Sequence, residues 1–227
     1  MIVSSSLALV TSHLSFPRSR RGALPRRSLG EGGFTLLELL TVLAILGILA
    51  ALIFPSVSAA RRSATKAKAR VQFTQWAAAI ESFRGEYGYY PAFDPSNLVN
   101  GGVTATDHLF HDILAAKRRD GTALAAGGSA AAQNRKLIAF YAFSDADFSP
   151  ANLIRDAFDN TAIAVLVDKD LDGVVRQGAD FATLPAVGGL TPAAADIPAA
   201  GLRAGVVFYA PAPGATVANP EFIFSWK

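Results

Sequence analysis

The sequence has no cysteine, and it has only three histidines and one methionine among 227 residues. Without cysteine the chain forms no disulfide, cysteine-ligated zinc site or iron–sulfur cluster, and it offers no thiol nucleophile. Common catalytic signatures are missing too: there is no GxSxG elbow, phosphate-binding loop, dinucleotide-binding glycine pattern or HExxH motif. An enzymatic role therefore has little support.

Charged residues are also scarce, at 17% of the chain against about 25% in typical soluble proteins, while 51% of the residues are hydrophobic. The net charge of +3 arises within residues 1–33, which contain five arginines and one glutamate. Removing that segment from the 21 basic and 18 acidic residues leaves 16 basic against 17 acidic. The basic character is thus local and does not indicate a nucleic-acid partner.

Much of the apolar excess lies in residues 36–54, a run of 19 residues with one charge, Glu38. As a helix rising about 1.5 Å per residue, the run reaches about 28 Å and can cross a hydrocarbon core about 30 Å thick. A secretory signal peptide has a shorter apolar region, about 7 to 15 residues, followed by small residues at its cleavage site. Residues 55–60, PSVSAA, could imitate such a site, but we prefer a membrane-spanning segment.

The residues before this run carry a recognisable pattern, in which the arginine-rich stretch PRSRRGALPRRSLGEGG leads directly into FTLLELL. This pattern resembles the class III leader of prepilins and pseudopilins: a basic leader, Gly33 at the cut, Phe34 after it and Glu38 four residues further on. Pro55 falls where many pilins carry a helix-bending proline. The resemblance implies that a membrane aspartyl prepilin peptidase cleaves between Gly33 and Phe34 and N-methylates Phe34.

Glu38 is the costly residue of the apolar run, because a carboxylate inside a membrane is penalised by roughly 2.5 to 3.5 kcal/mol on insertion scales. No partner for it is obvious in the precursor. The resemblance implies that, after cleavage, the new Phe34 amino group pairs with Glu38 of a neighbouring subunit as a filament grows. The alternative is that Glu38 lies at the cytoplasmic interface and reaches water.

The charges flanking the run do not settle the membrane orientation. Five basic residues precede it and five follow it: Arg18, Arg20, Arg21, Arg26 and Arg27, then Arg61, Arg62, Lys66, Lys68 and Arg70. The positive-inside rule therefore gives a near tie. The cleavage motif requires a cytoplasmic leader, so we expect a single pass through the bacterial inner membrane with the C-terminal domain in the periplasm.

Helical periodicity continues beyond Pro55. Apolar residues recur at spacings of three and four in two successive runs, between which the stripe shifts slightly around the helix: Val57, Ala60, Ala64, Ala67 and Val71, then Phe73, Trp76, Ile80, Phe83 and Tyr87. This pattern predicts an amphipathic helix that runs from Phe34 to about Arg84, bends at Pro55 and packs its aromatic stripe on a sheet. Gly85, Gly88 and Pro91 are expected to end it.

The remainder predicts short elements. We expect a short helix over 107–119, a flexible loop over 121–134, a strand or short helix over 137–143, strands over 162–167 and 173–175 joined as a hairpin, a long loop over 185–205, and last strands over 206–209 and 222–226. The predicted fold class is α+β and pilin-like, a long N-terminal transmembrane-to-periplasmic α-helix packed on a small antiparallel β-sheet. The predicted divisions are a leader (1–33), a transmembrane helix half (34–55), an amphipathic extramembrane half (56–90) and a C-terminal globular α+β domain (91–227).

Two further stretches resemble the major pseudopilins of type II secretion. The segment IRDAFDNTAIAVLVDKDLDGVV resembles their region of Asp-Pro-Trp/Phe-Gly-Asn-Pro followed by an Asp-rich turn, and the terminal FSWK resembles their Ser-Trp ending. Asp159 stands where that pattern has glycine, and Thr161 where it has proline. The element EYGYYP resembles the Tyr-Pro element that follows their long helix.

Asp168, Asp170 and Asp172, followed by Gly173, form the first part of a calcium-loop motif, in which hard carboxylate oxygens alternate toward one centre. The motif is incomplete, because its twelfth position is Ala179 and the acid, Asp180, comes one residue late. Calcium binding and a solvated turn built from Asp and Gly both remain open.

His108, His111 and Asp112 could share one face of a helix. A zinc site there would need a third or fourth ligand from scattered acids. We therefore expect these residues to lie on a surface helix.

The function indicated is a structural subunit of a type II secretion pseudopilus, processed by prepilin peptidase and polymerised through its N-terminal helix. The implied partners are other copies of the chain, the peptidase, an inner-membrane assembly platform and other pseudopilins, with no certain cofactor beyond possible calcium. One alternative is a type IV pilin for adhesion, motility or DNA uptake. Another is a membrane-anchored periplasmic binding or enzymatic domain that does not polymerise.

Overall fold

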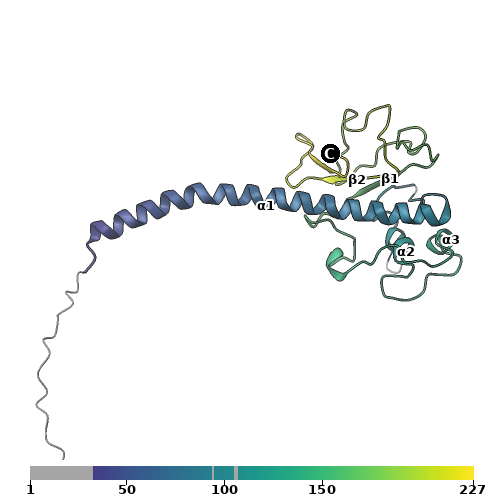
Figure 1. Cartoon of the computed structure of the whole chain (residues 1–227), viewed down its shortest axis with the longest axis horizontal. Helices are drawn as coiled ribbons and strands as arrows, with labels where there is room; N and C mark the ends of the chain where they lie inside the picture. Colours follow the sequence, from purple (N-terminus) through teal and green to yellow (C-terminus); the bar gives the residue numbers. More distant parts are fainter. Residues whose placement is uncertain (1–32, 94, 105–106) are drawn as a thin grey trace, which may run out of the picture. The chain divides into compact units, whose positions relative to one another are not determined.

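The computed structural model describes residues 33–93, 95–104 and 107–227, so the predicted leader before Gly33 lies outside the described residues. Its elements follow in this order along the chain (Figure 1): α1 Leu36–Tyr87, α2 Leu109–Ala115, α3 Ser129–Gln133, a 3-10 turn Asp145–Asp147, β1 Ala164–Val167, β2 Val206–Pro211 and β3 Phe222–Phe224. One long helix followed by a small antiparallel sheet confirms the predicted α+β, pilin-like class. The chain divides into two compact units between Ala50 and Ala51.

The C-terminal part of α1 forms the centre of the second unit. Phe73, Trp76, Ile80 and Phe83 recur every three or four residues and are completely buried, which confirms the predicted aromatic stripe. The helix passes through Gly85 and ends at Tyr87, so Gly85 does not terminate it as predicted. Gly88 ends it, with a φ of 79° that favours glycine and an N–H that donates to Arg84 O at 2.7 Å.

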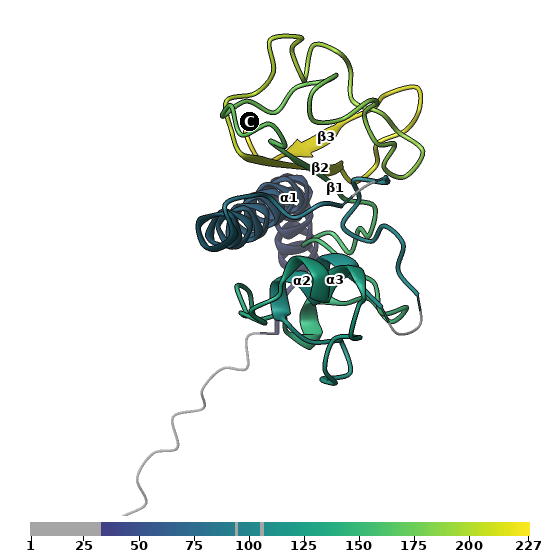
Figure 2. The same ribbon diagram turned by 90° about the vertical axis from the view of Figure 1, so that its right-hand side faces the viewer.

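The three strands form one antiparallel sheet in the order β1-β2-β3. Val165 pairs with Phe208 and Ala210 with Ile223, and these four side chains share one face of the sheet with the α1 stripe in a single core. Figure 2 shows the sheet on one side of α1 and the α2–α3 pair on the other.

Trp76 connects these two layers of the core. Its ring centroid lies 5.7 Å from Phe208 on the sheet and 5.5 Å from Phe110 on α2. Aromatic rings at this separation and tilt attract each other beyond the gain from burial alone. The expectation that the stripe packs on the sheet is confirmed, and α2 adds a second contact layer.

The predicted hairpin of 162–167 with 173–175 is wrong. β1 pairs with β2, and Val175 instead makes an isolated bridge with Leu202. The Asp-rich turn does not link paired strands, because the sheet partner of β1 begins 39 residues after Val167, a pairing that local patterns do not predict. The predicted last strands are confirmed as β2 and β3, with β3 ending at Phe224 rather than Trp226.

Two other local predictions also need correction. The loop expected over 121–134 contains the short helix α3. The segment 137–143 forms neither a strand nor a helix. Its expected aromatic packing is present, since Phe140 lies 5.4 Å from Phe83 and Tyr141 lies 4.6 Å from Phe143, ring centroid to centroid.

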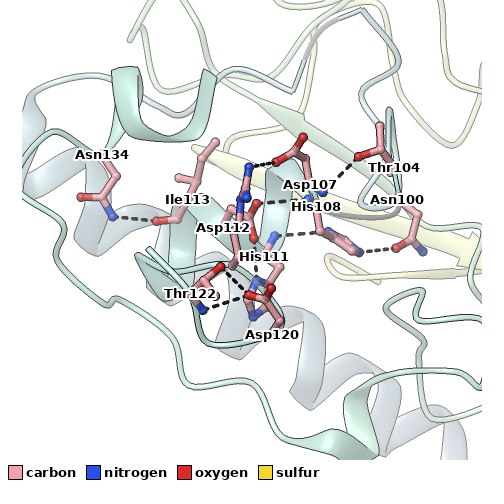
Figure 3. Close-up of polar contacts among 11 residues, drawn as sticks. Asn100, Thr104, Asp107, His108, His111, Asp112, Ile113, Asp120, Thr122 and Asn134 are labelled. Atoms are coloured by element: carbon pink, nitrogen blue, oxygen red, sulfur yellow. Dashed lines mark hydrogen bonds and ion pairs between the residues drawn. The ribbon is translucent and has the colours of Figure 1, made fainter. Parts of the chain in front are cut away.

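The helix predicted over 107–119 is confirmed as α2, but its polar residues do not lie on the surface. His108, His111 and Asp112 are only 2% to 3% exposed. His108 Nε2 lies 2.9 Å from Asn100 Oδ1, and His111 Nδ1 lies 2.8 Å from Asp112 Oδ1 (Figure 3). Mutual hydrogen bonding removes much of the free-energy cost of burying polar groups. The residue types alone do not show that these partners are available.

Asn100 extends this network into two further segments. Its amide donates to Ile154 O and Thr161 O, each at 2.7 Å, while its carbonyl oxygen accepts from Ile154 N at 2.9 Å. His108 serves as the N-cap of α2, because its side chain accepts from His111 N. The acceptor nitrogen is Nδ1, at 3.5 Å, so the proton of the neutral ring is on Nε2, where it donates to Asn100.

Burial, together with the neighbouring His111, lowers the pKa of His108 to about 4, against the opposing effect of Asp112. Because the unfolded chain binds this proton more tightly, the contribution of His108 to stability is fully present above about pH 6.5 and is lost as the pH falls toward 4. We expect the free energy of unfolding to fall over this range by on the order of 3 kcal/mol. Urea unfolding of the detergent-solubilised chain, followed by tryptophan fluorescence, measures the fall.

The matched variant is His108→Asn, which keeps a side chain able to cap α2 but cannot titrate. It is expected to start less stable at neutral pH and to show a shallower loss on acidification. Equal slopes in the wild-type chain and the variant would show that His108 does not carry the pH dependence.

Candidate functional site: the start of α1 and the acidic loop

The residues at the predicted cleavage point are accessible. Gly33 and Phe34 precede α1, and the Phe34 side chain is 83% exposed. A Cβ placed on Gly33 would meet nothing within 4 Å. The described residues therefore set no steric requirement for glycine at position 33.

Glu38 has a partner inside its own chain. Glu38 Oε2 accepts hydrogen bonds from Thr35 N at 2.8 Å and Thr35 Oγ1 at 2.9 Å, while Glu38 N donates to Thr35 Oγ1 at 3.1 Å. This reciprocal arrangement is a capping box, which satisfies two N–H groups at the start of a helix. The Thr-x-x-Glu spacing is the sequence signal for this capping box, so Glu38 does have a partner within its own chain.

Apolar side chains on both sides of Glu38 are exposed along the first turns of α1. They include Leu36, Leu37, Leu39, Leu40, Val42, Leu43, Ile45, Leu46, Ile48 and Leu49. A continuous apolar surface of this kind indicates an apolar environment or a partner that covers it. It is consistent with the location of the resemblance to prepilins, which lies in the same segment.

Within the described parts of the chain, no helix combines the length and hydropathy needed to cross a membrane. The predicted span over 36–54 is therefore not confirmed and stays a prediction. Pro55 lies inside α1, and the bend predicted there also stays a prediction.

The acidic loop directly follows β1 and is held by its own backbone. The buried Asp168 carboxylate accepts from Gly173 N at 2.7 Å and from Asp172 N at 3.2 Å. Gly173 has a φ of 85°, a turn conformation that favours glycine. Asp180, also buried, accepts from Lys169 N at 2.6 Å and from Arg176 N at 2.7 Å.

The acids that come together differ from those of the motif. Carboxylate oxygens of Asp168, Asp170 and Asp180 lie within 4.8 Å of one another. Asp172 Oδ2 instead lies 2.6 Å from Arg176 Nη2. Asp180, although one residue later than the acid of the calcium-loop motif, thus joins Asp168 and Asp170 in one group of carboxylates.

The three carboxylates could bind a hard cation, and the backbone hydrogen bonds to Asp168 and Asp180 also form a stable turn without one. Burial raises the pKa of the Asp168 carboxyl; the hydrogen bond from Gly173 opposes the rise, and the nearby Asp170 carboxyl adds to it. Calcium takes six to eight oxygen ligands, of which three carboxylates supply a part. Within the described residues, His108 and His111 belong to no such metal-ligand group; they are buried and hydrogen-bonded to Asn100 and Asp112.

Comparison with known proteins identifies one segment of the chain. The model of the family described as "prokaryotic N-terminal methylation motif" matches residues 29–54. No curated protein and no solved structure matches the chain. The matched segment contains Gly33, Phe34 and Glu38, the positions on which the resemblance to prepilins rested.

The match implies, in general terms, processing by prepilin peptidase and polymerisation into filaments, and it indicates a membrane-anchored structural protein. Residues 29–54 carry the prokaryotic N-terminal methylation motif, the prepilin cleavage motif of type IV pilin-like proteins.

Proposed function

We propose that this chain is a structural subunit of a type II secretion pseudopilus, cleaved between Gly33 and Phe34, N-methylated at Phe34 and polymerised through the first half of α1. The match of the methylation motif to residues 29–54 carries this proposal. The exposure of Phe34 and of the apolar side chains that follow supports it, because a peptidase and neighbouring subunits need access to them. The chain itself catalyses no reaction in this proposal.

The anchoring segment is residues 36–54, and it crosses the bacterial inner membrane once with the C-terminal domain in the periplasm. Its length, about 28 Å as a helix, supports a single pass. The leader must face the cytoplasm for the peptidase to act, which fixes the orientation where the flanking charges do not. The proposed divisions remain 1–33, 34–55, 56–90 and 91–227, with Pro55 as the bend between the helix halves.

The capping box gives Glu38 a hydrogen-bond partner in the membrane, before the subunit joins a filament. In the unassembled subunit Thr35 satisfies the carboxylate with two hydrogen bonds, which lowers the cost of keeping it in an apolar segment. In the filament the α-amino group of Phe34 from a neighbouring subunit adds an opposite charge. A subunit docked out of register leaves that cation without an anion, so the pair favours one register.

A type IV pilin for adhesion, motility or DNA uptake carries the same processing motif. The pseudopilus is preferred because the segment 154–175 and the terminal FSWK resemble major pseudopilins. Adjacent genes for a secretin and a secretion platform would agree with the pseudopilus, and a gene for a retraction ATPase would favour the pilus. If the processed chain forms no filament, it is instead a membrane-anchored periplasmic domain that does not polymerise.

Calcium is proposed for the acidic loop as a structural ion. Three carboxylates within 4.8 Å of one another support it, those of Asp168, Asp170 and Asp180, because the arginine beside them, Arg176, is shared between Asp170 and Asp172. Asp172, part of the sequence motif, is paired with Arg176 and is not needed in this arrangement.

Calcium is expected to raise the Tm of the wild-type chain and to leave the Tm of Asp170→Asn unchanged, since that variant loses one carboxylate ligand. Asp172→Asn is the matched control and retains the calcium response. Differential scanning fluorimetry with calcium or with a chelator measures these shifts. If calcium does not change the Tm of the wild-type chain, the loop is a hydrogen-bonded turn and not a calcium site.

Processing gives a direct mass prediction. Intact-mass and N-terminal analysis of the protein extracted from membranes should show a chain that begins with methylated Phe34. The same analysis of a strain lacking the prepilin peptidase should show the residues before Phe34 still attached. Recovery of the unprocessed chain from peptidase-positive cells contradicts the proposed function.

Two variants separate the charge of Glu38 from its capping role. Glu38→Gln keeps a hydrogen-bond acceptor for Thr35 but removes the negative charge, whereas Thr35→Ala removes the capping hydroxyl and keeps the charge. We expect filament yield to fall at least about tenfold in Glu38→Gln, since losing a buried charge partner costs well over 1.4 kcal/mol. Thr35→Ala should lose far less.

Sheared-filament yield, normalised to the amount of membrane-inserted subunit, measures both variants. Membrane insertion should be unchanged in each. Wild-type filament yield from Glu38→Gln argues against the pairing mechanism, and an equal loss in both variants assigns the role of Glu38 to the cap.

A further inference from the structure

The cations that follow the apolar segment are left unexplained by the proposed function. Arg61, Arg62, Lys66, Lys68 and Arg70 fall within ten residues, and no acidic residue occurs between Glu38 and Glu81. They lie on the periplasmic side of the proposed anchor, where the positive-inside rule gives them no role in orientation. A run of one charge sign on an exposed helix requires a counter-charge from elsewhere.

We propose that this cationic segment, residues 61–70 of α1, binds the anionic phospholipid headgroups of the membrane leaflet from which the helix emerges. The inference rests on the membrane anchoring in the proposed function, but it does not require polymerisation. The surface that would be recognised is a layer of phosphodiesters bearing net negative charge.

The position of Arg61 and Arg62 along the helix fits the outer edge of a headgroup layer, whereas Lys68, fourteen residues after Phe54, lies about 21 Å along the axis. Ile53, Phe54 and Val57 are exposed apolar residues, and Arg61 follows Phe54 by seven residues, about 10 Å along the axis. The headgroup zone on each side of a bilayer is roughly 5 to 8 Å thick. Side chains of an α-helix lean toward its N-terminus, so Arg61 and Arg62 lean back toward the apolar residues and hence toward the membrane.

Local partners account for only part of this charge. Lys66 Nζ lies 3.4 Å from Glu221 Oε1, and Arg70 is half-buried against the domain. Arg61, Arg62 and Lys68 are exposed and have no ion pair within the described residues. These three cations are therefore available to an external anion.

A small cavity beside the cations has the amphipathic lining that a headgroup needs. Its volume is about 230 Å³, and its lining includes Arg62, Ser63 and Lys66 of α1, Glu221, which pairs with Lys66, and the apolar residues Phe158, Pro213 and Ile223. Arg62 and the Ser63 hydroxyl match a phosphate, and the apolar side chains match the glycerol and upper acyl carbons.

A second copy of this chain fits the cations less well than lipid does. Among the described residues, the exposed carboxylates include Asp145, Asp159 and Glu221, which pair with Arg119, Arg155 and Lys66, and Asp120, which accepts hydrogen bonds from Thr122 and has no ion pair. Arg61 and Lys68 lie on nearly the same face of the helix, while Arg62 points about 100° away. A lipid surface can surround the helix and reach both directions, whereas one protein neighbour covers one face.

The test uses the full-length chain reconstituted into nanodiscs that contain equal amounts of phosphatidylglycerol and phosphatidylcholine. Native mass spectrometry then measures which lipid stays bound to the released subunit. We expect phosphatidylglycerol to be enriched on the order of fivefold or more, the effect of one engaged cation near an anionic surface. High salt during reconstitution should reduce the enrichment.

The variant Arg61→Gln/Arg62→Gln/Lys68→Gln removes the three available cations and keeps a good helix former at each position. It should show equal retention of the two lipids. Lys117→Gln/Arg135→Gln/Arg203→Gln removes the same charge from exposed positions elsewhere in the domain and should keep the wild-type preference.

The possible failures are distinguishable. Equal enrichment in the wild-type chain and the first triple variant overturns the lipid proposal. If that variant keeps the lipid preference but no longer forms filaments, the cations contact a neighbouring subunit, and the lipid proposal is also wrong. A wild-type chain that does not enter the nanodiscs overturns the membrane anchoring and the lipid proposal together. A wild-type chain that prefers phosphatidylglycerol but forms no filaments overturns polymerisation alone.

Discussion

A carboxylate in an apolar helix must always have a partner, and the behaviour of Glu38 follows from this constraint. Before assembly, the constraint is met within one chain, because Thr35 donates both its N–H and its hydroxyl to Glu38. These are neutral donors, so they offset only part of the cost of burying a charge. In the proposed filament, the cationic amine of a neighbouring subunit would be a stronger partner, and the difference between the two arrangements would favour assembly in one register.

The globular part of the chain is organised around a different constraint, the burial of the aromatic stripe of α1. Trp76 and Phe73 contact Phe208 of the sheet, while Trp76 also contacts Phe110 of α2. The other face of the sheet packs in a second core that contains no α1 residue and includes Leu166, Tyr209 and Phe224. The element proposed to build the filament therefore holds one face of the sheet and α2 together, while the loops around the sheet cover the other face.

The features predicted from the sequence were those set by local spacing. The three- and four-residue recurrence of Phe73, Trp76, Ile80 and Phe83 identified both the helix and its buried face. The stretches around Val206 and Phe222 were correctly identified as strands because β-branched and aromatic residues cluster there. The methylation motif was recognisable because Gly33, Phe34 and Glu38 stand at fixed short distances.

The features that were missed depend on contacts distant in sequence. The hairpin after β1 was wrong because β1 pairs with a strand that follows a long loop. His108 was placed on the surface because its partner Asn100 and the carbonyl oxygens of Ile154 and Thr161 satisfy a network that only folding assembles. The capping box is local, because Thr35 and Glu38 are three residues apart, and the Thr-x-x-Glu pattern is the sequence signal for it.

The most direct measurement of the central claim is a solid-state NMR distance between subunits in a filament. Subunits carrying ¹⁵N-phenylalanine would be co-assembled with subunits carrying ¹³C-glutamate, and the Glu38→Gln chain would assign the signal. The account predicts a contact between the Phe34 nitrogen of one subunit and the Glu38 carboxyl carbon of another, within the roughly 4 to 6 Å over which opposite charges pair. Absence of that contact, in filaments whose Glu38 carboxylate remains on Thr35 of its own chain, would contradict it.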